Sequence, residues 1–158
     1  MVYVATIETA ASTQKSSPLA TELKVSKGLI YKFELYFPPG PSGLVGVRVL
    51  QGSHQLYPYS IDEWFLGDRE KIEFDDLMII GNEQTILVIE TYNLDDTYQH
   101  LIQLRLGILT QPEYIEHYLP SVERANYESF MRKLSERQEA EHQERLEKII
   151  AGLPGGEG

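Results

Sequence analysis

The first two thirds of the chain alternate apolar and polar positions with a period of two. From Leu29 to Phe37 the odd positions are apolar, while Lys32 and Glu34 project to the other side. This pattern is typical of a strand with one buried face. Val45, Val47 and Val49 repeat it after a loop, residues 38–43, that is rich in proline and glycine. The longest alternating run predicts a central strand whose buried face holds Tyr98, His100, Ile102, Leu104, Leu106 and Ile108.

Weaker alternation predicts further strands over residues 3–9, 22–25, 71–80 and 85–92. Turns are expected at Gly81-Asn82, between two of these strands, and over residues 93–97. Seven or eight short strands with such closely spaced turn signals favour an antiparallel β-sandwich or jelly roll over residues 1–109. No segment between the strands is long enough and helical enough for a parallel crossover.

The pattern changes after residue 109, where helix-forming residues dominate. Thr110 and Glu113 fit a capping box, which predicts a short helical linker over residues 110–120 that ends at a proline. Ser121 is expected to cap a long helix over residues 121–152, stopped by glycine and proline. The remaining residues, 153–158, are expected to form a disordered tail.

The long helix carries two apolar stripes separated by a polar stretch over residues 137–145. One interpretation is an exposed helix whose two ends touch its own domain. The other is an arm that packs against another chain, because a lone domain would leave the distal aliphatic residues in water. On the second interpretation the interface residues of the arm are Phe130, Leu134, Leu146, Ile149, Ile150 and Leu153.

Composition narrows the function classes. The chain has 158 residues, a formal net charge of −10 and no cysteine, which excludes disulfides, thiolate zinc sites and cysteine nucleophiles. The acidity argues against nucleic acid as a partner, because phosphate binding depends on clustered Lys and Arg. No stretch approaches the ~20 apolar residues of a membrane span, and the first residues do not resemble a signal peptide. These features favour a cytoplasmic location.

Chemical motifs are scarce. The histidines stand far apart, and no phosphate loop, nucleophile elbow or dinucleotide fingerprint is present. His100 is interpreted as a hydrogen-bonded structural residue. Acid pairs at Asp62-Glu63, Asp75-Asp76 and Asp95-Asp96 suit turn formation, and they could alternatively hold Ca²⁺ through carboxylate oxygens. The sequence thus predicts no enzyme and no cofactor.

One aromatic segment is a possible ligand or partner contact. Tyr57, Tyr59 and Trp64 stand close together between the predicted strands. Exposed rings in such a loop could stack on sugars, so a carbohydrate-binding module, with or without Ca²⁺, is the alternative function. Trp64 and Phe65 could instead close one end of the core, whereas Tyr57 and Tyr59 are left open.

Four sequence blocks together resemble small β-rich accessory virion proteins of tailed phages and prophages. They are Tyr36–Gly46, His54–Pro58, Glu63–Asp68 and Tyr92–Tyr98, and they span most of residues 25–109. The resemblance implies a non-enzymatic protein that decorates or binds a capsid or tail lattice, often as a homo-oligomer. Our prediction is therefore a structural or interaction protein that oligomerises or docks through its helical arm.

Overall fold

A computed structural model describes residues 1–118 and 124–151 of the chain. Its elements in chain order are β1 (Val2–Thr9), β2 (Leu19–Phe37), β3 (Val45–Gln51), β4 (His54–Tyr57), β5 (Phe65–Leu66), β6 (Glu70–Asn93), β7 (His100–Leu109), α1 (Gln111–Tyr118) and α2 (Arg124–Ala151). The chain divides into a β unit, Met1–Gln111, and a helical unit that begins at Pro112. Neither helix of the described chain combines the length and the apolar character that a membrane span requires.

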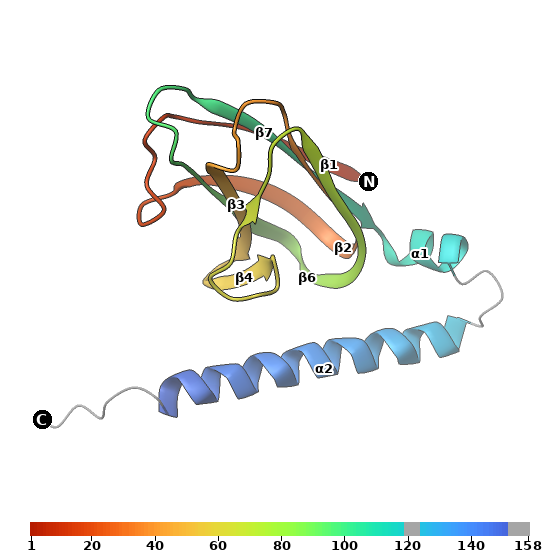
Figure 1. The fold of residues 1–158 in the computed structure, drawn as a ribbon. Helices are drawn as coiled ribbons and strands as arrows, with labels where there is room; N and C mark the ends of the chain where they lie inside the picture. Colours follow the sequence, from red (N-terminus) through yellow and green to blue (C-terminus); the bar gives the residue numbers. More distant parts are fainter. Residues whose placement is uncertain (119–123, 152–158) are drawn as a thin grey trace, which may run out of the picture. The chain divides into compact units, whose positions relative to one another are not determined.

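The described strands form one antiparallel sheet with the order β1-β7-β2-β6-β3-β4, and β5 pairs with β3 beside this path (Figure 1). The long strands β2 and β6 pair with each other along most of their length. β7 joins the second half of β2, while β3 joins the last part of β6. The long strands therefore contribute to both halves of the sandwich. The prediction of an antiparallel β-sandwich followed by a helical arm is confirmed.

Two strand boundaries were predicted wrongly. The separate strands expected over residues 22–25 and 29–37 are one strand, β2, and no turn interrupts β6 at Gly81-Asn82. Instead the register shifts there: Ser26 pairs with Gln84, whereas Gly28 pairs with Ile80. This register shift accommodates Gly81, for which the sequence predicted a turn. It is a bulge, which bends a strand without ending it.

Gly28 is required at this bend because the chain passes close to β7. A Cβ atom at this position would lie 2.6 Å from the carbonyl oxygen of Leu109 and 2.7 Å from a side-chain carbon of Ile108. Any larger residue would force the two strands apart, so glycine permits the close approach.

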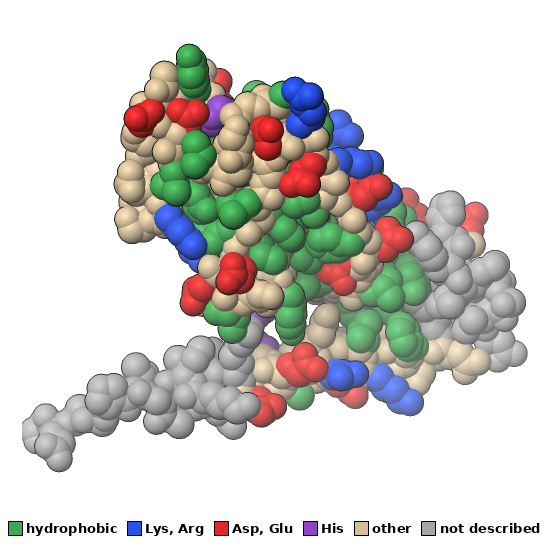
Figure 2. All heavy atoms as spheres, viewed as in Figure 1, with side chains coloured by type: hydrophobic (Ala, Val, Ile, Leu, Met, Phe, Trp, Pro, Cys, Tyr) green, Lys and Arg blue, Asp and Glu red, His purple; other side chains and the backbone are tan. Residues whose placement is uncertain are grey.

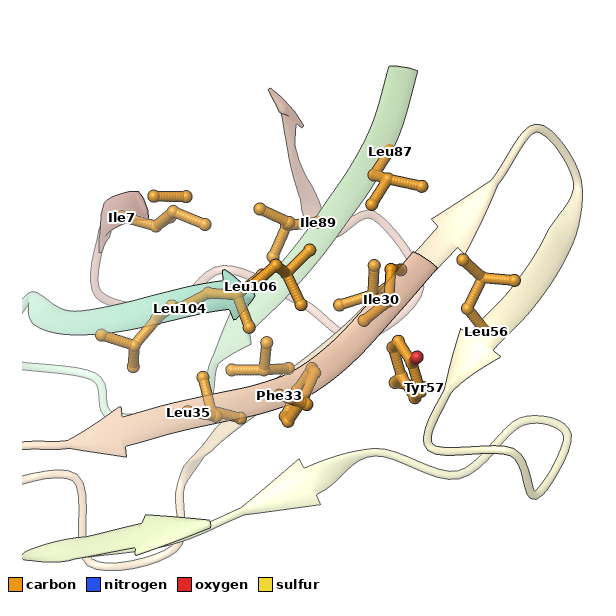
Figure 3. Close-up of a cluster of buried hydrophobic side chains, with 14 of the residues drawn as sticks. Ile7, Ile30, Phe33, Leu35, Leu56, Tyr57, Leu87, Ile89, Leu104 and Leu106 are labelled. Atoms are coloured by element: carbon orange, nitrogen blue, oxygen red, sulfur yellow. The ribbon is translucent and has the colours of Figure 1, made fainter. Parts of the chain in front are cut away.

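The core lies inside the bent sheet and draws on both halves. Figure 3 shows apolar side chains of β1, β2, β4, β6 and β7 converging on one interior. The predicted buried face of β7 is confirmed for its four aliphatic members, Ile102, Leu104, Leu106 and Ile108, which are completely buried. It is wrong for Tyr98, which is 67% exposed and precedes the strand. Such burial, at about 25 cal/mol per Å² of apolar area, is the main stabilising contribution to the β unit.

The helical unit begins where the sequence predicted. α1 starts directly after Thr110, and α2 ends at Ala151, one residue before the predicted end of the long helix. The proposed Ser121 cap and the expected tail over residues 153–158 lie outside the described residues. Of the predicted arm interface, Phe130 is 46% exposed and Leu134 is half-buried. The side chains of Leu146, Ile149, Ile150 and Leu153 lie outside the described part of the chain.

Candidate functional site

Tyr57 anchors one end of the loop that follows β4. Its ring is buried and lies 4.9 Å from the ring of Phe33 and 5.6 Å from that of Phe74, centroid to centroid. Its hydroxyl donates a hydrogen bond to Oδ2 of Asp76 at 2.5 Å. Burial, followed by this hydrogen bond and the nearby negative charge, raises the pKa of Tyr57 well above its ordinary value. Tyr57 is therefore a structural residue that holds β4 against β6.

Gln55 braces the middle of the same loop. Its side-chain nitrogen donates to the carbonyl oxygens of Pro58 at 2.7 Å, Ser60 at 2.9 Å and Glu63 at 3.1 Å. A backbone hydrogen bond of 3.2 Å from the Glu63 amide to the Ser60 carbonyl closes the turn. An amide group has two N–H donors, so one of them is shared between two carbonyls. One side chain thus fixes three points of the loop backbone.

Trp64 anchors the other end of the loop. Its indole ring is buried and meets the ring of Tyr92 edge-on, with centroids 4.9 Å apart. The guanidinium carbon of Arg48 lies 4.4 Å from the indole centroid, a cation–π distance. Nη2 of Arg48 also lies 2.6 Å from Oε2 of Glu90. The sequence drew attention to Trp64, but it gave no signal for the role of Arg48, because that residue comes from β3.

Between these anchors, residues 58–63 form a surface loop that we call the Tyr59 loop. Tyr59 is 69% exposed and Ile61 is 63% exposed, although both are large apolar side chains. Of the contact loop expected from Tyr57, Tyr59 and Trp64, only Tyr59 is exposed, because Tyr57 and Trp64 are buried. Burial of Trp64, and the packing of Phe65 against the core, support the alternative that these two close the core.

The sequence segment that contains the Tyr59 loop is acidic. The sequence has no Lys or Arg between Arg48 and Arg69, whereas Asp62, Glu63 and Asp68 fall in this interval. Asp62 and Glu63 are themselves exposed residues of the loop. On the visible face of the β unit in Figure 2, acidic, basic and apolar side chains are interspersed. The loop therefore presents apolar contact surface beside negative charge.

Of the other acidic pairs, Asp95-Asp96 serves a turn, whereas Asp75-Asp76 lies within β6. Oδ1 of Asp95 accepts the amides of Thr97 at 2.8 Å and Tyr98 at 3.0 Å, and Oδ2 lies 2.9 Å from Nε2 of His100. These contacts, the two backbone amides first, lower the pKa of Asp95. His100 is therefore hydrogen-bonded, as the sequence indicated.

Asp68 has a similar structural role in the proline-rich loop. Its Oδ1 atom accepts the amides of Gly40 at 2.8 Å and Ser42 at 3.2 Å, and these hydrogen bonds lower its pKa. In the described residues no group of three or more His, Asp or Glu side chains is placed to hold a metal ion. Asp68 and Asp95 thus have structural partners that account for their positions.

A shallow groove of about 220 Å³ lies elsewhere on the β unit. Its lining residues are Glu34, Tyr36, Lys71, Gln103 and Arg105. The charged members are already paired: Nη1 of Arg105 lies 3.6 Å from Oε2 of Glu34, and Nζ of Lys71 lies 2.5 Å from Oε2 of Glu73. Alternation along β2, β6 and β7 explains this polar outer face, so the groove is weaker than the Tyr59 loop as a candidate site.

Comparisons with known proteins add no assignment. The chain matches no protein-family description, and a search of curated protein sequences finds no match. The Tyr59 loop is accordingly the candidate site that the structure itself supports.

Proposed function

We propose that this chain is a non-enzymatic structural protein that binds protein partners, and specifically an accessory virion protein of the capsid-decoration or tail-associated kind. The observation that carries the proposal is the Tyr59 loop, which presents Tyr59 and Ile61 to solvent from a braced backbone. The sequence resemblance supplies the virion assignment, and the loop supplies a surface suited to binding another protein.

The construction of the loop favours protein binding. Tyr57 and Trp64 fix its ends and Gln55 fixes its middle. The conformational entropy of the loop is therefore lost when the chain folds and not when a partner binds. Tyrosine contributes much contact area at a low entropy cost, and it is enriched among the residues that dominate interface energies. Two exposed apolar side chains on a rigid loop therefore suit a small interface anchor.

The carbohydrate-binding alternative has less support from the geometry. A stacking platform needs several rings exposed together, whereas Tyr59 is the one ring of the three predicted that is exposed. A glycan array tests this alternative directly. Specific glycan binding that disappears in Tyr59→Ala would favour the carbohydrate-binding function over protein docking. Loss of that binding in the presence of a chelator would show that the site also needs Ca²⁺.

Incorporation into virus particles tests the proposed function. Virus particles whose genome encodes this chain should contain the protein. The purified chain should also bind to particles of the same kind that lack it. The Tyr59→Ala/Ile61→Ala variant should lose this binding, while Tyr98→Ala, at a tyrosine that is 67% exposed in another loop, should retain it. Absence of the protein from purified particles would reject the virion role, and equal binding by both variants would reject the loop as its docking surface.

A further inference from the structure

One face of helix α2 carries basic side chains beside apolar ones, whereas the Tyr59 loop carries acidic side chains beside apolar ones. Phe130 and Leu134 stand four positions apart, so they share a face of the helix. Lys133 and Arg137 flank this pair, because they lie three and seven positions after Phe130. Two bases, Lys133 and Arg137, therefore lie on this face, whereas Arg132 lies on the opposite one. We call the four residues Phe130, Lys133, Leu134 and Arg137 the basic face of α2.

This face is open enough for contact. Phe130 is 46% exposed, Leu134 is half-buried, and both Lys133 and Arg137 are exposed. Nε of Arg137 lies 3.1 Å from Oε1 of Glu141 in an exposed i,i+4 pair. Such a surface pair contributes only about 0.3–0.5 kcal/mol, so it does not prevent Arg137 from taking another partner.

The basic face complements the Tyr59 loop in two respects. Phe130 and Leu134 would meet Tyr59 and Ile61, which removes large apolar side chains on both sides from water. Lys133 and Arg137 would face Asp62 and Glu63 in a segment of the β unit that has no base of its own. The Tyr59 loop and the basic face of α2 belong to the same chain. Copies of this one protein can therefore supply both sides of the interface.

We propose that the Tyr59 loop of one copy binds the basic face of α2 in a second copy. This inference rests on the proposed function, since it identifies the partner that occupies the loop. In a symmetric pair each copy donates one helix and receives one, which is the isologous arrangement commonest among homo-oligomers. Particle binding then requires the assembled dimer, so Tyr59→Ala/Ile61→Ala removes the dimer and particle binding together.

Charge reversal tests the pairing in the full chain. Sedimentation should show a concentration-dependent dimer that Lys133→Glu/Arg137→Glu weakens by about tenfold or more, because like charges then face each other. Asp62→Lys/Glu63→Lys should weaken it similarly, and combining the four changes should restore it. Arg132→Glu, on the opposite face of α2, is the matched control and should leave the dimer unchanged. Failure of the combination to restore association, with folding verified by circular dichroism, would overturn the proposal.

Disulfide trapping distinguishes a second copy from the same copy. The chain has no cysteine, so Ile61→Cys and Leu134→Cys introduce one thiol each. Two differently tagged preparations, one with each substitution, should form a mixed disulfide on oxidation. Leu77→Cys, at another exposed apolar position, replaces Ile61→Cys in the control. The second-copy assignment would be overturned if the protein stayed monomeric at all concentrations and a disulfide formed only within the chain that carries both substitutions.

The two proposals can fail separately. If charge reversal and trapping show no dimer but Tyr59→Ala/Ile61→Ala still abolishes particle binding, the second-copy inference is wrong and the proposed function stands. If the dimer forms as described and particles never contain the protein, the virion role fails and the inference stands.

Discussion

The hydroxyl of Tyr57 donates a 2.5 Å hydrogen bond to Oδ2 of Asp76, and so joins β4 to an irregular position of β6. Asp76 and Leu77 lie together opposite Tyr31, because Ile30 pairs with Met78 and Lys32 pairs with Asp75. Oδ1 of Asp76 accepts the Leu77 amide at 2.7 Å. The same carboxylate therefore stabilises the bulge and holds the strand that leads into the Tyr59 loop.

Replacing Tyr57 by Phe should destabilise the β unit by about 1–3 kcal/mol, since a carboxylate loses its charge-assisted hydrogen bond while the ring packing stays. Urea unfolding followed by circular dichroism measures the loss. Tyr98→Phe, at an exposed tyrosine, should change the free energy of unfolding little. Equal effects of the two substitutions would contradict the structural role of the Tyr57 hydroxyl.

Alkaline pH should weaken the fold through Tyr57. Its pKa is raised above the ordinary 10.0 in the folded state, so the folded chain holds this proton more tightly than the unfolded chain does. The resulting stabilisation is fully present below pH 10.0 and is lost as the pH rises above that value. The free energy of unfolding should therefore fall less steeply above about pH 10 in Tyr57→Phe than in the unchanged chain. Identical slopes would reject this linkage.

Acid pH should act through Asp95. Its pKa is lowered by the Thr97 and Tyr98 amides and then by His100, so the unfolded chain binds this proton more tightly. The stabilisation is present above the ordinary pKa of 3.8 and is lost as the pH falls below it. Asp95→Asn should reduce the acid sensitivity of unfolding. Asp96→Asn, which keeps an Oδ1 acceptor for the Thr97 hydroxyl, is the neighbouring control and should reduce it less.

Loss of the Gln55 amide should loosen the Tyr59 loop. Gln55→Ala leaves the carbonyls of Pro58, Ser60 and Glu63 without their common donor. Limited chymotrypsin digestion should then cut after Tyr59 several times faster, because cleavage follows local opening. Gln14→Ala, which removes one exposed hydrogen bond to Ser12, should leave that rate unchanged. An unchanged rate in Gln55→Ala would show that the aromatic anchors alone hold the loop.

A methyl group at Gly46 should disturb the Trp64 anchor. A Cβ atom there would overlap the ring of Tyr92, on which the Trp64 indole packs. Gly46→Ala should destabilise the fold by about 1–3 kcal/mol, as overpacking does. At Gly81 a Cβ atom would meet nothing within 4 Å, so Gly81→Ala should be neutral or slightly stabilising in the same urea experiment. Similar losses at both positions would argue against a specific clash at Gly46.

The sequence by itself determined the elements in which local pattern and burial agree. Alternation placed Ile102, Leu104, Leu106 and Ile108 on one buried face of β7, and helix-forming composition placed α2 at the C-terminus. These features follow from side-chain periodicity, which each segment carries by itself. The structural role of His100 could also be predicted, because it shares the face of that strand.

Only the tertiary structure decided which aromatic residues are available for contact. Tyr57 and Tyr59 are two positions apart and look equivalent in sequence, yet one is buried and the other is 69% exposed. The difference comes from Phe33, Phe74 and Asp76, which lie far from Tyr57 along the chain. Gly81 likewise has turn chemistry, but long-range pairing of β2 with β6 carries the strand through it. Burial and pairing depend on neighbours that local pattern does not specify, so the candidate site emerges only when distant segments meet.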